Sequence, residues 1–167
     1  VTTMQETYND HGTSSNMDLT VYMPIPSNRV AQYVVGSVAV RGYDLKEHKE
    51  IVVMESSVGL ANAVGFNWIW NDKGTGGDHD VTIARPVCPS GYSSVSDFTL
   101  AGYCKGDDCL DKLQDEMEKL KLNIMPCIDD TMLLDCPQKL APLVWNDHGS
   151  GGDHDVSVFS LVGPPQN

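Results

Sequence analysis

Short stretches in which apolar and polar residues alternate cover most of the chain and predict β-strands. We expect strands near residues 1–8, 19–23, 33–40, 51–54, 66–70, 81–84, 94–100, 124–128, 132–134, 143–145 and 156–162. We expect the first clear strand to stop at Pro24 and a later one at Pro86, because proline cannot donate to a strand ladder. Short strands separated by Gly, Pro, Asn and Asp predict an all-β fold.

One stretch departs from this two-residue period. Residues 108–122 carry Leu110, Leu113, Met117 and Leu120 at helical spacing. Acidic residues stand toward its start and lysines toward its end, as the helix dipole favours. We therefore expect one short inserted helix at about 108–122, and its apolar stripe suits core packing better than a partner or membrane face.

A repeated loop organises the strands. The sequence WNDKGTGGDHDVTI at 70–83 is repeated as WNDHGSGGDHDVSV at 145–158. A more divergent copy, YNDHGTSSNMDLTV, stands at 8–21. Apolar residues lead into each copy and β-branched residues lead out of it. The Gly, Asn and Asp between them favour a tight turn. Each copy therefore predicts a strand, a Gly-rich acidic loop and a second strand, with loops at 8–18, 70–80 and 145–155.

These pseudo-repeats predict the architecture of one domain, residues 1–167. Three units that are each a short antiparallel sheet would form a β-prism around one core. We expect the first and last strands of the chain to complete one unit together. An ordinary β-sandwich is the alternative.

Composition limits the classes of function. The 167 residues carry a net charge of −12, which argues against nucleic acid as a partner, since phosphate backbones require clustered Lys and Arg. No run reaches the roughly 18 apolar residues that cross a membrane, so we expect no membrane insertion. The first residues lack the basic and apolar parts of a signal peptide, which fits a mature secreted chain.

The five cysteines show no zinc-finger spacing and indicate up to two disulfides in an oxidising compartment. Cys104–Cys109 and Cys127–Cys136 are candidate local pairs, although sequence does not fix the connectivity. The cysteine left over is either free or joins two chains as a homo-oligomer.

Residues 70–92, WNDKGTGGDHDVTIARPVCPSGY, resemble the vacuolar-protein-sorting-like proteins of plants, fungi and invertebrates, most of them uncharacterised. Arg85-Pro86 and Gly91-Tyr92 stand where that family has Arg-Pro and Gly-Tyr. Ala84 replaces the family's second tryptophan, as do Tyr22 and Phe159 in the other units. The resemblance covers most of the chain except residues 104–122, and it implies little about function.

The expected prism is also similar, more distantly, to that of jacalin-related lectins, which hold sugar in a Gly-x-x-x-Asp loop. That resemblance implies a carbohydrate-binding role for Gly76, Gly77, Asp78, His79 and Asp80, and for Gly151, Gly152, Asp153, His154 and Asp155. The first loop has Ser14 in place of the glycine and ends at Asp18, so we expect a weaker or lost site there. The aspartate would accept hydrogen bonds from sugar hydroxyls.

The same loop residues allow other interpretations. Asp18, Asp80 and Asp155 could instead bond to loop N–H groups and hold the turn. Carboxylates could converge on Ca²⁺, the candidate ligands being Asp72, Asp78, Asp80, Asp147, Asp153 and Asp155. A histidine such as His79 with an aspartate could bind zinc or copper, but an exposed loop residue is the commoner role.

The aromatic residue before each loop, Tyr8, Trp70 or Trp145, could stack on sugar, but we favour burial in a pseudo-symmetric core layer. No nucleophile elbow, phosphate loop or HExxH motif occurs, so we do not expect an enzyme. The sequence thus predicts a secreted lectin that binds glycans. The alternatives are a Ca²⁺-binding structural or matrix protein and the recognition module of a defence or pore-forming protein.

Overall fold

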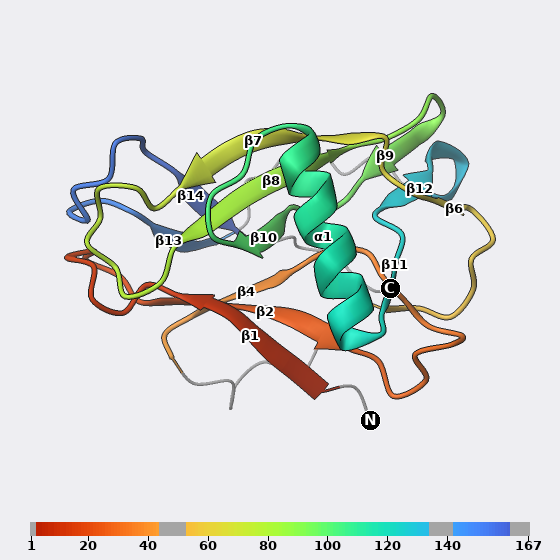
Figure 1. The fold of residues 1–167 in the computed structure, drawn as a ribbon, viewed down its shortest axis with the longest axis horizontal. Coiled ribbons are helices and arrows are strands. Elements are labelled where there is room, and N and C mark those ends of the chain that lie inside the picture. Colours follow the sequence, from red (N-terminus) through yellow and green to blue (C-terminus); the bar gives the residue numbers. More distant parts are fainter. Residues whose placement is uncertain (1–2, 44–52, 134–141, 161–167) are drawn as a thin grey trace.

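The structure, a computed structural model, describes residues 3–43, 53–133 and 142–160. It is mostly β-sheet with one α-helix, which confirms the expected all-β class (Figure 1). Three antiparallel hairpins dominate it, each built around one copy of the repeated loop. The hairpin strands are β1 (Thr3–Asn9) with β2 (Leu19–Ile25), β7 (Gly65–Asn71) with β8 (Val81–Val87), and β13 (Leu143–Asn146) with β14 (Ser157–Phe159).

A third strand extends two of the hairpins. β4 (Val38–Arg41) pairs with β2, and β10 (Phe98–Ala101) pairs with β8, each antiparallel. In the described part of the chain the third sheet consists of β13 and β14 alone. The first and last strands therefore belong to different sheets, and the expectation that they complete one unit is wrong. A local hairpin across each tight loop closes a shorter segment than a pairing of the chain ends, and shorter closure costs less entropy.

Each hairpin carries a register shift in its first strand, directly before the aromatic residue of the motif. Such a bulge re-aims the next side chain. Tyr8, Trp70 and Trp145 are 2%, 0% and 1% exposed, and they share one apolar cluster with Leu19 and Val81. The preference for core burial of these aromatics is therefore confirmed.

Helix α1 (Asp107–Leu120) lies across the sheet of β7, β8 and β10 (Figure 1). Leu113 is buried with Phe66, Phe98 and Leu100, and Leu110, Met117 and Leu120 pack against this second apolar cluster. The apolar stripe of the helix is thus used in the core. No helix in the described ranges is long and apolar enough to cross a membrane.

Two expected long strands are each split in two. Residues 33–40 form β3 (Tyr33–Val34) and β4, and residues 94–100 form the end of β9 (Tyr92–Ser94) and β10. The two breaks meet: a Cβ added to Gly36 would lie 2.1 Å from the Ser96 Cβ, and Ser37 N–H donates to Asp97 O at 3.2 Å. Both strands are interrupted where the segment at Gly36 and Ser37 lies against the segment at Ser96 and Asp97. The absence of a side chain on Gly36 permits this close approach.

The remaining short elements complete two small sheets, β11-β3-β5 and β6-β12-β9. They are β5 (Val53–Met54), β6 (Leu60–Ala61), β11 (Asn123–Ile124) and β12 (Cys127–Asp129). A 3₁₀ helix, Asp130–Met132 (η2), stands where a strand at 132–134 was expected, because the Asp129 side chain caps Thr131 N–H at 2.8 Å and favours a turn.

Two disulfides stand in the described residues. The Cys104–Cys109 disulfide joins the first turn of α1 to the segment just before the helix, and it confirms one of the two predicted pairs. Cys127 pairs with Cys88 rather than with Cys136, so the second predicted pair is wrong. The cause is sheet pairing: β12 lies antiparallel to β9 and brings Cys127 beside the end of β8, 39 residues away in sequence. Cys136, the cysteine that these two disulfides leave over, lies outside the described residues, so its role as a free thiol or as a link between two chains stays a prediction.

Candidate functional site

The three repeated loops meet at one end of the molecule, on the left in Figure 1. A closed ring of backbone hydrogen bonds joins them. Asn16 N–H of the first loop donates to His148 O of the third at 3.2 Å, and Asp153 N–H of the third donates to Lys73 O of the second at 3.1 Å. Asp78 N–H of the second loop completes the ring on His11 O at 3.0 Å. The loops are therefore a single rigid platform rather than three separate turns.

The first aspartate of each motif holds its own loop closed. Asp10, Asp72 and Asp147 are 2%, 3% and 5% exposed. Each carboxylate accepts the N–H of the residue nine positions later, at 2.9 to 3.0 Å, in Leu19, Val81 and Val156. We call these three residues the inner aspartates. Burial raises the pKa of Asp72, with the nearby Asp80 charge a smaller cause. A hydrogen bond from a backbone N–H to a carboxylate across the loop base fixes the shape of the loop.

The glycine two positions after each inner aspartate allows the loops to touch. Gly12, Gly74 and Gly149 have φ of +86°, +89° and +89°. A Cβ on Gly74 would lie 3.1 Å from Asp153 Oδ1 and 3.2 Å from Gly151 O, both in the next loop. Glycine is thus required here both by conformation and by the close approach.

The buried aromatic residues connect the loops on the side that faces the core. Trp70 Nε1–H donates to His154 O at 2.8 Å, and Trp145 Nε1–H donates to Met17 O at 2.8 Å and to Asp10 Oδ2 at 2.8 Å. The two indoles meet edge to face, with ring centroids 5.7 Å apart. Tyr8 occupies the third position, and its hydroxyl is buried with no hydrogen-bond partner in the described chain. This burial raises the pKa of Tyr8 above its ordinary value.

The last aspartate of each motif, by contrast, is exposed: Asp18, Asp80 and Asp155, which we call the outer aspartates. Within the described residues, none of their carboxylates accepts an N–H of its own loop. Asp80 Oδ1 instead accepts Tyr103 O–H at 2.9 Å. The turn-holding role that the sequence left open for these residues is therefore performed by the inner aspartates.

Two tyrosines that the sequence analysis did not assign to the site stand beside the loops. Tyr103 is 43% exposed and follows β10, and Tyr43 is 47% exposed and follows β4. Tyr43 O–H donates to Asp10 Oδ1 at 3.0 Å. Partial burial of both hydroxyls, and then their bonds to aspartate, raises the pKa of each tyrosine. The Gly-Tyr dipeptide repeated at 42–43 and 102–103 was the signal that could have identified them.

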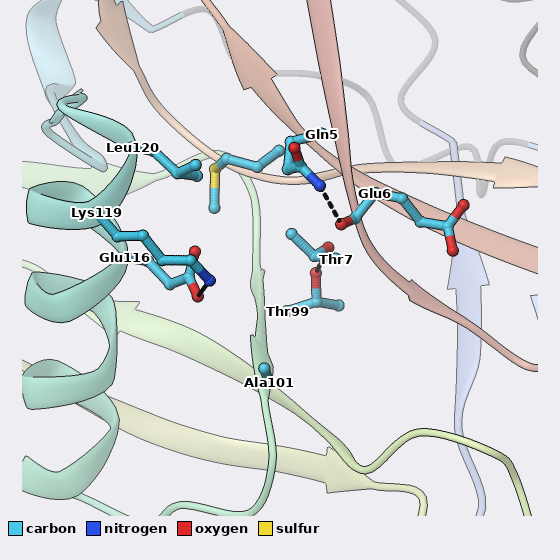
Figure 2. Close-up of a pocket in the computed structure, with 9 residues that line it drawn as sticks. Gln5, Glu6, Thr7, Thr99, Ala101, Glu116, Lys119 and Leu120 are labelled. Carbon is cyan, nitrogen blue, oxygen red and sulfur yellow. Dashed lines mark hydrogen bonds and ion pairs between the residues drawn. The ribbon is translucent and has the colours of Figure 1, made fainter.

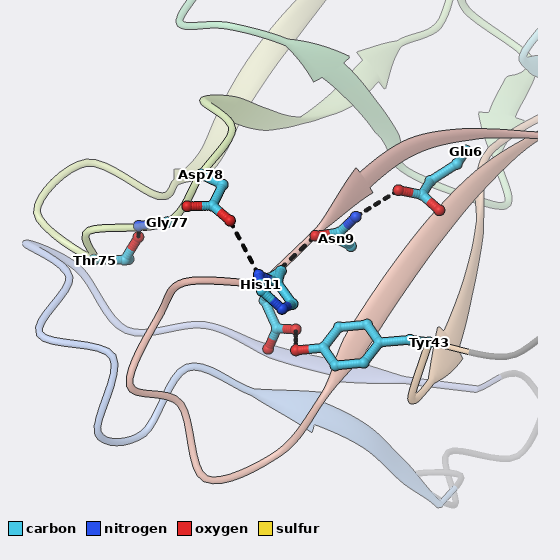
Figure 3. A network of polar contacts seen from close by, with 8 residues as sticks. Glu6, Asn9, His11, Tyr43, Thr75, Gly77 and Asp78 are labelled. Atoms are coloured by element: carbon cyan, nitrogen blue, oxygen red, sulfur yellow. Dashed lines mark hydrogen bonds and ion pairs between the residues drawn. The ribbon is translucent and has the colours of Figure 1, made fainter.

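The histidines and remaining aspartates lie on the exposed rim. His11 Nδ1 is 3.0 Å from Asp78 Oδ2, which ties the first loop to the second (Figure 3). His148 Nδ1 is 3.1 Å from the Asn16 side-chain amide. His154 packs against the Trp68 ring, with centroids 5.2 Å apart. His79 and Asp153 are exposed.

The glycine pairs use part of their backbone within the platform. Gly77 N–H donates to Thr75 Oγ1 at 3.2 Å, as Figure 3 shows, and Gly152 N–H donates to Ser150 Oγ at 3.2 Å. Gly76 and Gly151 have φ of +75° and +78°. Like those of Gly74 and Gly76, the N–H groups of His79 and Asp80 make no hydrogen bond to the described residues, so they are among the free donors of the second loop.

The candidate cation ligands do not converge. Across residues 3–43, 53–133 and 142–160, no group of three or more His, Cys, Asp and Glu side chains is placed to hold a metal ion. Two of the six candidates, Asp72 and Asp147, are turned inward on backbone N–H groups. Calcium binding stays a prediction from sequence.

A separate hollow of about 220 Å³ lies between β1, β10 and α1 (Figure 2). Thr7 and Thr99 meet on its wall with their hydroxyl oxygens 2.9 Å apart, and Glu116 pairs with Lys119 at 3.6 Å. None of the sequence-predicted site residues lines it.

No family model and no curated protein matches the sequence. Among solved structures, the fold is similar to the crystal structure of GNIP1Aa from Chromobacterium piscinae, with a TM-score of 0.68 and 24% sequence identity. The match covers 94% of this chain but 28% of that one. The likeness shows a shared fold, which in GNIP1Aa is part of a much longer chain.

Proposed function

We propose that this chain is a secreted, non-enzymatic carbohydrate-binding protein whose loop platform takes a glycan at the second loop. One observation carries the proposal: Asp80 is exposed and bonded to Tyr103 O–H, while the carboxylate that accepts an N–H across the loop base is that of the buried Asp72. The loop does not need the Asp80 carboxylate for its shape. The carboxylate is therefore available to a ligand.

The chemistry of this site suits a sugar. A carboxylate accepts hydrogen bonds from neighbouring hydroxyls, and charge-assisted bonds of this kind are the stronger ones. The half-exposed Tyr103 ring offers an apolar face beside it, and aromatic side chains supply rigid contact area with a polar edge. The N–H groups of His79 and Asp80 can donate to sugar oxygens. Acceptor, donors and ring stand within one loop and the tyrosine packed on it.

The three loops are not equivalent in this respect. The second has the glycine pair, the outer aspartate and the tyrosine. The first has Tyr43 and Asp18 but lacks the glycine pair, and the third has Asp155 without a tyrosine among the described residues. We therefore place the strongest site at Asp80, with Asp18 and Asp155 as weaker sites that add avidity on a branched glycan.

The β-prism is proposed as the architecture of this platform. Three hairpins whose loops join in a ring and whose aromatic residues share one core layer support it. Cys88–Cys127 and Cys104–Cys109 support secretion, since disulfides persist in oxidising compartments.

Binding of the intact chain to an array of immobilised glycans tests the proposal. We expect Asp80→Ala to abolish binding and Tyr103→Ala to weaken it strongly, whereas Tyr103→Phe retains the ring and loses less. Asp111→Ala, which removes one exposed carboxylate from α1, is the matched control and should bind normally. Binding that survives in a folded Asp80→Ala, or no binding by the parent chain to any glycan, would refute the proposal.

A further inference from the structure

In the part of the chain that the structure describes, the third sheet has two strands, whereas its two equivalents have three. β4 pairs with β2 and β10 pairs with β8, each on the strand that leaves the loop. β14 is the corresponding strand of the third hairpin, and within the described residues its one ladder partner is β13. Among residues 3–43, 53–133 and 142–160, one edge of β14 thus has no partner at the position where the repeats place a third strand.

The side chains of β14 are uncovered as a result. Thr20 and Thr82 are 1% and 0% exposed, and each hydroxyl donates to the carbonyl of the glycine after the third strand, Gly42 or Gly102. Ser157, their equivalent, is exposed. Phe159 is 43% exposed, whereas its equivalent Ala84 is fully buried. These positions are therefore buried in β2 and β8 but exposed to solvent in β14.

The backbone at this edge is arranged to pair. Val156 exchanges bonds with Asp147, and Ser160 N–H donates to Pro142 O, so residues 156, 158 and 160 face β13. Backbone groups of successive strand residues alternate in direction in an antiparallel ladder. The N–H and C=O groups of Ser157 and Phe159 consequently face the open edge. Unpaired strand edges are templates for another strand.

The repeats also define which strand fits. In the occupied sheets the residue opposite the Thr is Val40 or Leu100, both 1% exposed, and the residue before it is Ala39 or Thr99. This smaller residue faces the neighbouring hairpin, since β10 contacts β1 through Thr99 and Thr7, and β4 contacts β13.

The corresponding neighbour of β14 is β7, where the residue equivalent to Thr7 is Ile69. The incoming strand therefore needs a small residue against Ile69, then a large apolar residue. A glycine must follow at positive φ, as in Gly42 (+85°) and Gly102 (+71°), and then an aromatic residue.

We propose that the open edge of β14 binds an extended segment of another polypeptide, antiparallel to β14, with the pattern apolar, small, large apolar, any residue, Gly, Tyr. Addition of a strand to a sheet edge is an established mode of peptide recognition. The tyrosine of the bound segment would stand beside the third loop, as Tyr103 stands beside Asp80. Binding of the segment would thus complete the third loop.

A synthetic peptide with the sequence of residues 96–103, SDFTLAGY, is the probe, added to the intact chain. We expect saturable binding, with slowed amide hydrogen exchange at Ser157 and Phe159. Val158, whose amide already faces β13, should not change and is the internal control. No binding, or binding that leaves both edge amides unprotected, would overturn the proposal. Slow exchange at both amides before peptide is added would show the edge already covered, by a second copy or by this chain itself, and would also overturn it.

Backbone-methylated peptides sharpen the test without altering the protein. In β10 the Leu100 N–H faces the neighbouring strand, whereas Thr99 N–H points away and donates to Ser37 Oγ. Methylation at the Leu100 position should weaken binding about tenfold, because one strand bond is lost. Methylation at the Thr99 position should have little effect. Equal loss or equal retention for the two peptides would contradict strand addition.

Discussion

The buried carboxylate of Asp72 should contribute to stability through one hydrogen bond, and its charge should oppose stability. Its Oδ1 accepts Val81 N–H at 2.9 Å at a site that is 3% exposed. Asp72→Ala leaves that N–H buried without a partner, which costs about 2–3 kcal/mol in the free energy of unfolding. Asp72→Asn keeps an acceptor oxygen and removes the charge, so we expect a change of at most about 1 kcal/mol at neutral pH.

The pH dependence separates the two contributions. Burial raises the pKa of Asp72 above 3.8 in the folded chain, so the folded chain holds this proton more tightly than the unfolded one. The contribution of Asp72 to stability is therefore greatest at low pH and falls as pH rises from about 3.8 through the raised pKa, after which it is constant. Asp72→Asn, which does not titrate, should gain stability relative to the parent chain over that window.

Denaturant unfolding of the parent chain and both variants, at a series of pH values from about 3 to 7, measures these differences. An alanine variant as stable as the asparagine variant would refute the role of the hydrogen bond. An asparagine variant that loses stability relative to the parent chain as pH rises would refute the opposing role of the charge.

Three further outcomes follow from the platform. Trp145→Phe removes an indole N–H bonded to two oxygens and should lower the free energy of unfolding by about 3 kcal/mol. Tyr8→Phe removes a hydroxyl without a partner in the described residues and should be neutral or stabilising. Thermal unfolding of the two variants beside the parent chain measures both effects. Gly74→Ala should destabilise the chain by about 2 kcal/mol because of its positive φ and its contact with the third loop, and Gly65→Ala, at a glycine with open space around it, should cost far less. Millimolar Ca²⁺ should leave the melting temperature unchanged, since the candidate ligands do not converge, and a clear rise would instead support the calcium alternative.

The sequence was most informative where local chemistry decides the structure. Each WND-to-DHD repeat forms a strand, a tight loop and a strand, because asparagine, aspartate and glycine dictate the turn and β-branched residues dictate the exit. The burial of Trp70 and Trp145 was also predictable, since large aromatics at equivalent positions favour a shared core layer.

Contacts between distant segments were beyond sequence reasoning. The Cys88–Cys127 disulfide depends on the pairing of β9 with β12, and the split of residues 33–40 depends on the crossing at Gly36. The roles of the two aspartates in each loop could not be separated either. Spacing alone does not show that Asp72 turns inward onto Val81 N–H while Asp80 stays exposed and accepts Tyr103 O–H from a distant segment.

The most direct test of the central claim is a crystal structure of the chain with the glycan that binds best on an array. We predict sugar hydroxyls within hydrogen-bond distance of the Asp80 carboxylate and a sugar face against the Tyr103 ring, with Asp72 still bonded to Val81 N–H. A glycan bound on another face of the molecule, with Asp80 and Tyr103 untouched, would contradict the account.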